Sequence, residues 1–155
     1  MSPDLKHELK QNKPFKSLCE EAHLSMVRTS NLLLNDFERM LKPYEITGTQ
    51  YNVLRILRGA EPNGLCRNEV AERLVNRMPD ATRLLDRMEE AGLVTRERAE
   101  SDRRLVTTRI TKEGMRLVNS LDDEVVSQHE KGLGHLSRKD LEKLIELLTQ
   151  VRNRD

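Results

Sequence analysis

Arginine is distributed unevenly along this 155-residue chain, in a pattern that suggests recognition of phosphates and base edges. The span from Pro43 to Thr111 contains no lysine, whereas nine lysines and six arginines lie outside it. The twelve arginines of the span are Arg55, Arg58, Arg67, Arg73, Arg77, Arg83, Arg87, Arg96, Arg98, Arg103, Arg104 and Arg109. A planar guanidinium can form two parallel hydrogen bonds with a phosphate or a guanine, which a lysine ammonium cannot. The pattern favours a nucleic-acid surface modestly over its alternative, in which these arginines only pair with neighbouring acids.

A charged turn, a strand and the start of a helix follow one another in residues 102–114. The alternation of side chains over Val106–Ile110 predicts the strand. Thr111 is a favoured N-cap, and Glu113 falls in the first helical turn, where the helix dipole favours an acid. The segment is therefore typical of the second strand of a hairpin that runs directly into a helix.

An amphipathic pattern upstream completes this unit. Residues from Pro79 to Ala91 are predicted to form a helix that Gly92 ends, and Val94–Arg98 is predicted to form the first strand of the hairpin. Helix, strand, arginine-bearing turn and strand, in this order, predict a winged helix-turn-helix. Such a unit places one helix in the major groove of DNA and a β-hairpin beside it.

Helical spacing of apolar residues predicts five more helices. They cover Phe15–Leu41, Thr47–Gly59, Arg67–Val75, Thr111 to His129, where Gly132 and Gly134 follow as breakers, and a last helix that opens at Ser137. The expected fold is mainly α with a small β-wing, in which N- and C-terminal dimerisation helices flank a winged helix-turn-helix reader.

The terminal helices are expected to pair with a second copy of the chain. Hydrophobic residues make up 36% of the chain and aromatic residues 3%, which is little for a monomeric core. A first helix of about 25 residues would be nearly 40 Å long, too long for the small reader to cover. The expected organisation is a flexible arm at 1–14 and one domain at 15–155, with a reader at about 47–110 and dimerisation helices at about 15–42 and 111–152.

Other classes of function have little support in the sequence. No apolar run reaches the roughly 18 residues of a membrane span, and no export signal opens the chain, so we expect a cytoplasmic protein without a membrane partner. The spacing of His23, His129 and His135 fits no compact metal site. We find no phosphate-binding glycine loop and no nucleophile–base pair, so we expect neither a cofactor nor enzymatic activity.

The motif residues resemble those of a known family. The segment Thr82–Arg96, followed by Asp102-x-Arg104 and Thr111-x-x-Gly114, is similar to the MarR family (multiple antibiotic resistance regulators). The resemblance covers nearly the whole chain. It implies a homodimeric transcriptional regulator, usually a repressor, that binds double-stranded DNA at a pseudo-palindromic operator and is released by a small aromatic ligand. The alternative is a winged-helix module for protein–protein interaction without DNA binding.

The resemblance also assigns roles along the predicted recognition helix. It implies that Thr82 and Arg83 reach base edges, with Arg83 on guanine O6 and N7. Arg87, one turn later, is expected to meet phosphate. Asp80 is included as a candidate DNA contact, although an acid that only stabilises the helix dipole is the favoured interpretation. Asp86 is expected to hold Arg103 or Arg104 of the wing turn, or to pair within its own helix with Arg83 or Arg87.

Further candidate DNA contacts lie outside that helix. Arg67 and Asn68 begin the third helix, where backbone amides can face phosphate, and ordinary capping is an equal alternative. The resemblance places Arg104 at the wing tip, in the narrow minor groove, with Arg103 as the alternative. Asp102 is expected to support this arginine through a charge-assisted hydrogen bond.

The family's ligand pockets lie between the dimerisation helices and the reader. By this resemblance the lining would draw on Ser30, Leu33, Phe37, Tyr51 and Leu54.

Cys19 was compared with the peroxide-sensing branch of the family, in which a reactive cysteine lies early in the first helix. That branch has tyrosines near the cysteine, whereas here Tyr44 and Tyr51 lie well downstream and two acids, Glu20 and Glu21, adjoin Cys19. A structural or idle cysteine is therefore the favoured interpretation.

Overall fold

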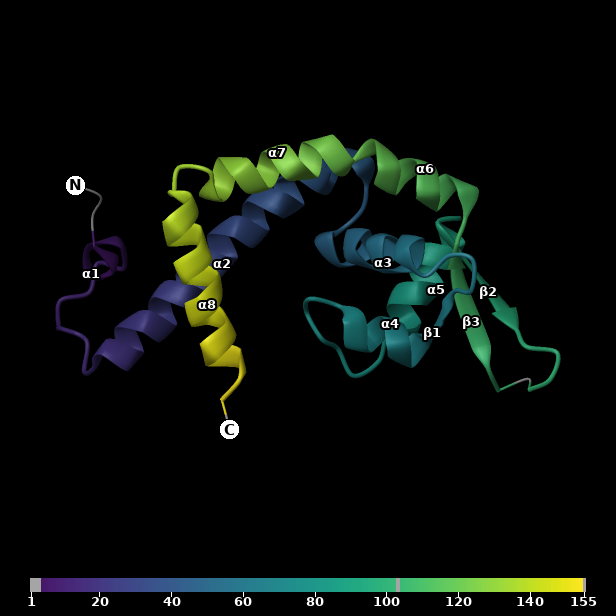
Figure 1. Cartoon of the computed structure of the whole chain (residues 1–155), viewed down its shortest axis with the longest axis horizontal. Helices are drawn as coiled ribbons and strands as arrows, with labels where there is room; N and C mark the ends of the chain where they lie inside the picture. The colour runs from purple at the N-terminus through teal and green to yellow at the C-terminus, as the bar shows by residue number, and fades with distance from the viewer. Residues whose placement is uncertain (1–3, 103, 155) are drawn as a thin grey trace. The chain divides into compact units, whose positions relative to one another are not determined.

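The computed structural model describes residues 4–102 and 104–154 (Figure 1). The chain divides into two compact units, and the boundary between them in the sequence lies between Met40 and Leu41. Its elements are α1 (Leu5–Glu8), α2 (Leu18–Leu41), the 3₁₀ turn η1 (Lys42–Tyr44), α3 (Gly48–Gly59), β1 (Leu65–Cys66), α4 (Arg67–Arg73), α5 (Thr82–Glu90), β2 (Val94–Arg98), β3 (Val106–Ile110), α6 (Lys112–Ser120), α7 (Asp122–Leu133) and α8 (Arg138–Arg152). The mainly helical fold with a small β-wing is confirmed.

The first unit consists of α1 and most of α2. The range 1–14, predicted to be a flexible arm, contains α1, whose first turn is capped by the Asp4 carboxylate. Helix α2 begins at Leu18 rather than at Phe15, because the Ser17 hydroxyl accepts a hydrogen bond from the Glu20 amide at 3.1 Å and so fixes the first turn.

The second unit contains the reader, in which α3, α4 and α5 pack with a three-stranded sheet. Helix α3 starts where the sequence predicts, because Thr47 and Gln50 form a reciprocal capping box. Its apolar face supplies three side chains without solvent exposure, Val53, Leu54 and Leu57. Val70 of α4 and Leu85 and Met88 of α5 join the same core.

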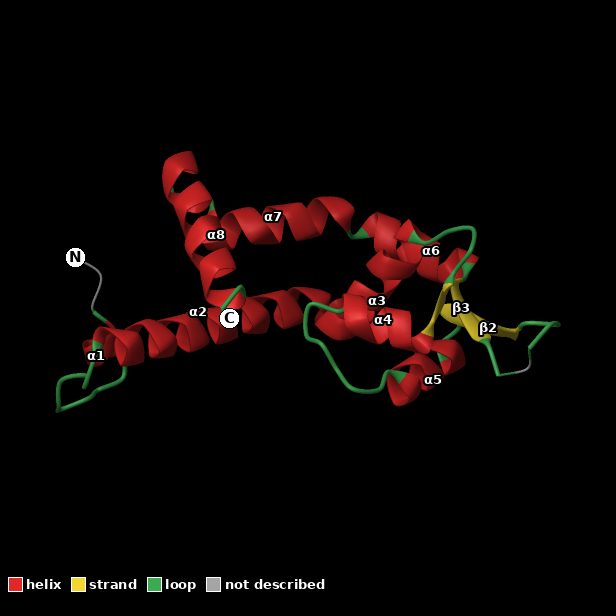
Figure 2. Cartoon of the chain, turned by 60° about the horizontal axis from the view of Figure 1, so that its bottom comes forward, coloured by secondary structure: helices red, strands yellow, loops and turns green. Residues whose placement is uncertain are grey.

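The antiparallel sheet has the strand order β1-β3-β2. Figure 2 shows its two longer strands, β2 and β3, side by side. The two longer strands have the predicted bounds, and their register pairs Val94 with Ile110. The two-residue strand β1, which pairs Leu65 with Thr108, was not predicted. Two residues are too few to show an alternating pattern, so only the neighbouring β3 makes this segment a strand.

The recognition helix is shorter than the sequence predicts. It begins at Thr82, with Ala81 as its N-cap, so Pro79 and Asp80 precede the helix instead of forming its first turn. The Asp80 carboxylate accepts a hydrogen bond from the Thr82 amide at 2.9 Å, which favours a turn over an earlier helical start. Gly92 follows the helix with a φ of 73°, a left-handed conformation that favours glycine at a helix end.

The predicted helix from Thr111 to His129 is two helices. Helices α6 and α7 meet at Leu121, whose side chain is fully buried and whose amide donates to the Val118 carbonyl at 3.3 Å. The acidic residues at 122–124 then form the first turn of α7, where the helix dipole favours them. Gly132 lies inside α7 and does not break it, and Ser137 caps α8 as predicted.

Candidate nucleic-acid interface

The recognition helix α5 separates its apolar and cationic side chains. Leu85 and Met88 are buried in the core of the reader. Arg83 and Arg87, one helical turn apart, are exposed, and their guanidinium groups form no hydrogen bond or ion pair with any described residue. Helix α5 therefore presents two arginines to the solvent from one face, as a DNA-reading helix requires.

A polar network fixes the start of this helix. The Arg67 guanidinium donates to the Thr82 hydroxyl at 3.2 Å, and that hydroxyl donates to the Asp80 carboxylate at 2.6 Å. The hydrogen bonds from Thr82 lower the pKa of Asp80, with smaller contributions from Arg67 and Arg83. Asp80 therefore acts as a turn-forming acid before α5, and a contact of its side chain with DNA stays a prediction.

The wing is joined to the recognition helix through Arg96 of β2. Its guanidinium lies 2.6 Å from the Asp86 carboxylate and 3.0 Å from that of Glu89, and its backbone amide donates to Glu89 at 3.0 Å. These bonds raise the pKa of Arg96, and the hydrogen bond from Arg96 lowers that of Glu89. Among the described residues Asp86 therefore pairs with Arg96 of the strand, and not with Arg104 or with an arginine of its own helix. A contact of Asp86 with Arg103 lies outside the described residues.

The turn between the two wing strands carries the predicted minor-groove arginine. The Asp102 carboxylate accepts a hydrogen bond from the backbone amide of Arg104 at 2.9 Å, so it shapes the turn instead of holding the Arg104 guanidinium. The side chain of Arg104 is exposed and pairs with no described residue. Arg103, the alternative, lies outside the described residues.

The spacing of Thr111 and Gly114 has a structural reason at the point where β3 leads into α6. The Thr111 hydroxyl donates to the Gly92 carbonyl at 2.6 Å and accepts from the Gly114 amide at 3.0 Å. A Cβ at Gly114 would overlap the carbonyl oxygen of Leu93 and would lie 2.9 Å from the Ile110 side chain. Only a glycine lets α6 lie this close to the hairpin.

Comparison with known proteins identifies the group of proteins that shares this arrangement. A sequence profile described as MarR family matches residues 44–105. The crystal structure of a MarR transcription factor from Planctomyces limnophilus is 37% identical, with 88% of this chain and 99% of that chain covered and a TM-score of 0.68. The chain belongs to the MarR family. This MarR protein is also 28% identical over 138 residues to the HTH-type transcriptional regulator FarR of Neisseria gonorrhoeae, which covers 89% of this chain and 93% of FarR.

A solved DNA complex is also similar to this MarR protein. The transcriptional repressor CouR, bound to a 23-mer DNA duplex, is 26% identical, with 92% of this chain and all of that chain covered and a TM-score of 0.77. The protein is thus a DNA-binding transcriptional regulator, and the interaction module without DNA binding is not supported.

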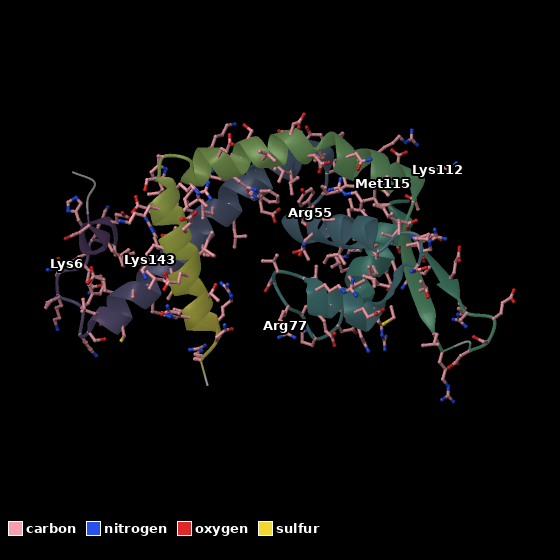
Figure 3. All side chains as sticks on the ribbon, viewed as in Figure 1. Lys6, Arg55, Arg77, Lys112, Met115 and Lys143 are labelled. Atoms are coloured by element: carbon pink, nitrogen blue, oxygen red, sulfur yellow. The ribbon has the colours of Figure 1, made fainter. Side chains whose placement is uncertain are left out.

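The arginines of the MarR reader form two groups. Arg58, Arg96 and Arg109 pair with acids, and Arg67 bonds Thr82. Within the described part of the chain, seven others have a guanidinium group with neither a hydrogen bond nor an ion pair: Arg55, Arg73, Arg77, Arg83, Arg87, Arg98 and Arg104. Figure 3 labels two of these, Arg55 on α3 and Arg77 before α5. The interpretation that arginines pair with neighbouring acids therefore holds for the first group, and DNA contact by the second group stays a prediction.

Four of the unpaired arginines were not predicted from the sequence as DNA contacts, and the first of them, Arg55, lies on α3. Arg73 lies in the last turn of α4, Arg77 in the connection to α5, and Arg98 at the end of β2. Two positions before Arg98 in the same strand, Arg96 is held by α5, and alternation places both side chains on one face of the hairpin. That spacing was visible in the sequence, but the partners of Arg96 were not.

The remaining sequence-predicted residues have mixed environments. Asn68, in the first turn of α4, is exposed. Of the proposed ligand-pocket residues, Ser30, Leu33 and Phe37 belong to the first unit. Tyr51 and Leu54 are buried in the second, and burial raises the pKa of Tyr51. Leu54 is a core residue with no solvent exposure, and a shared pocket stays a prediction.

Metal binding and membrane insertion have no structural signature in the described ranges. No group of three or more His, Cys, Asp or Glu side chains in residues 4–102 and 104–154 is arranged to hold a metal ion. Over the same residues, no helix combines the length and apolar character needed to cross a bilayer. Cys19 is exposed and Cys66 is half-buried, and both are free thiols.

Proposed function

We propose that this MarR protein is a homodimeric cytoplasmic repressor that binds a pseudo-palindromic DNA operator with two copies of the reader. The observation that carries the proposal is the set of exposed, unpaired arginines on α5 and on the wing turn, Arg83, Arg87 and Arg104. Their elements are joined through Arg96, so the helix and the wing approach DNA as one body.

Three of the unpaired arginines, together with residues at the start of α4, have assigned places in the proposed complex. Arg83, in the first turn of α5, reads a guanine edge with Thr82 beside it. Arg87 contacts phosphate, Arg67 and Asn68 contribute at the start of α4, and Arg104 enters the minor groove. An unpaired guanidinium suits this role because it loses no protein partner when it binds DNA.

Dimer formation follows from the apolar surface of α8. Leu144, Leu147 and Val151 recur at intervals of three and four residues and are 37%, 47% and 46% exposed. Helix α8 has no buried residue in the described structure. A stripe of this kind on a helix is stabilised by a second apolar surface, and a second copy of the chain supplies one.

We further propose that a small aromatic molecule releases the repressor from DNA. Two solved neighbours of lower identity bind or respond to aromatic molecules. CouR of Rhodococcus jostii RHA1 is bound to p-coumaroyl-CoA, and the DNA binding of BpsR of Bordetella bronchiseptica is regulated by 6-hydroxynicotinic acid. At 23% and 19% identity they show the fold of this chain and not its ligand. They support an aromatic effector class as the first to test.

The decisive experiment is a fluorescence-anisotropy titration of the dimer against the DNA upstream of its own gene. A shuffled duplex of equal length and composition is the control. We expect preferential binding to the upstream fragment and weaker binding when a panel of aromatic acids is added. Equal affinity for both duplexes over a range of salt concentrations would contradict a sequence-specific regulator of its own promoter, and selection from random duplexes would then test for any other operator.

A further inference from the structure

We propose that Arg58 is a positioning residue that fixes the direction of the α7–α8 arm relative to the reader and thereby sets the operator spacing that the dimer accepts. The proposal rests on the proposed function, because spacing has meaning only for a dimer with two readers. It assigns a role to an arginine that is not free to contact DNA.

Arg58 holds both sides of the break between α6 and α7. Its Nη1 donates to Asn119 Oδ1 at 2.8 Å, in the last turn of α6. Nη1 and Nη2 also donate to the two carboxylate oxygens of Asp122 at 2.9 and 3.0 Å, in the first turn of α7. One guanidinium at the end of α3 therefore connects the reader to the two helices that meet at Leu121.

The backbone at this break provides little rigidity of its own. The Leu121 amide donates to the Val118 carbonyl three residues back, and regular helical bonding resumes when the Val125 amide donates to the Leu121 carbonyl. The Leu121 side chain is buried, which anchors the joint but leaves the direction of α7 to the polar contacts around it. A bidentate arginine–carboxylate pair specifies such a direction well because its geometry is planar.

A second contact supports the same turn of α7. The Tyr44 hydroxyl, just before α3, donates to the Glu124 carboxylate at 2.5 Å, and this bond raises the pKa of Tyr44. Tyr44 and Arg58 lie at opposite ends of α3 in the sequence, so α7 is held from both ends of one reader helix. The Arg58 side chain is 27% exposed, less than the 76% of Arg116 in the surface pair with Glu113.

The arm carries the apolar stripe proposed for dimerisation, so its direction decides where the two readers stand. One added base pair moves a half-site along the duplex and rotates it by about a tenth of a turn. A dimer with a fixed arm tolerates this change poorly. Without the three bonds of Arg58 the joint at Leu121 bends more easily, and the dimer adapts to altered spacing.

The test compares Arg58→Met with wild type on the selected operator and on versions with one or two base pairs added to or removed from its centre. We expect wild type to prefer one spacing, and Arg58→Met to reduce that preference by about tenfold, the factor expected for a net charge-assisted hydrogen-bond contribution. Asp122→Asn, a smaller change, should act in the same direction. Arg116→Met, which breaks the exposed pair within α6, is the matched control and should leave the preference unchanged.

A second measurement separates positioning from folding. Amide hydrogen exchange at residues 121–125 should be faster in Arg58→Met, while the core of α3 and α5 keeps wild-type protection. If wild type binds no operator, the proposed function fails. If wild type shows a spacing preference that Arg58→Met and Asp122→Asn both retain, the positioning role is overturned while the function stands. A uniform loss of affinity at every spacing would also overturn it.

Discussion

Helices α3 and α8 have similar amphipathic sequences and opposite environments. Helix α3 has twelve residues and buries Tyr51, Val53, Leu54 and Leu57, whereas α8 has fifteen residues and buries none. The apolar face of α3 is covered by the sheet, α4 and α6 of its own chain. An apolar stripe on a helix therefore predicts that the stripe is buried, but it does not indicate which chain provides the covering surface. The reader has a core within one chain, and α8 lacks a cover in the described structure.

The largest expected effect comes from making the stripe of α8 polar. The double substitution Leu144→Asp and Val151→Asp should give monomers in sedimentation velocity and weaken operator binding by at least about 100-fold, because the two half-sites are then bound independently. The reader should keep its fold, because its core lies elsewhere. Glu142→Gln and Glu146→Gln, on exposed positions of the same helix, are controls. A double variant that stays a dimer would show that α8 is covered in another way.

An intermediate effect on DNA affinity is expected at the wing, which is proposed to contact DNA directly and does not depend on α8. Arg104→Ala should weaken operator binding by about 1–3 kcal/mol and leave the melting temperature and the dimer unchanged, because its side chain pairs with no described residue. Anisotropy titration and thermal unfolding measure the two quantities. Arg116→Ala is the control for loss of a surface arginine. A lower melting temperature with unchanged DNA affinity would make Arg104 structural.

The smallest effect should distinguish the two arginines of α5. Arg83→Ala should flatten the preference at one base pair in each half-site, because a base contact is lost. Arg87→Ala should weaken binding to operator and random DNA alike and lower the salt slope by about 1, as for a lost phosphate contact. Titrations over a randomised operator at two salt concentrations measure both. Unchanged base preferences in Arg83→Ala would refute its assignment.

Local signals predicted much of the fold from the sequence. The capping box at Thr47, the two longer wing strands and the cap at Ser137 depend on residues within a few positions of one another. Such features need no knowledge of distant contacts, so they could be read directly.

The differences arise where a distant or competing contact decides the outcome. Asp80 forms a local turn that delays the start of α5, and the continuous apolar pattern around Leu121 gave no sign of a break. The partner of Asp86 is a strand residue ten positions away, Arg96, which helical spacing could not suggest. For the candidate site, the arginines could be predicted from the sequence, but only the fold shows which of them already pair with another residue of the protein.

The tight packing at Gly114 extends the rigid part of the reader beyond the predicted boundary at about residue 110. Helix α6 lies against the hairpin at Gly114, and Val118 and Leu121 add two fully buried side chains to the second unit. Helix α6 thus packs as part of the core of the reader, although the sequence was interpreted as placing it in a dimerisation helix. A chain cut at Thr111 would leave Leu54 open to water, so the smallest piece able to read DNA as a rigid body extends to Leu121.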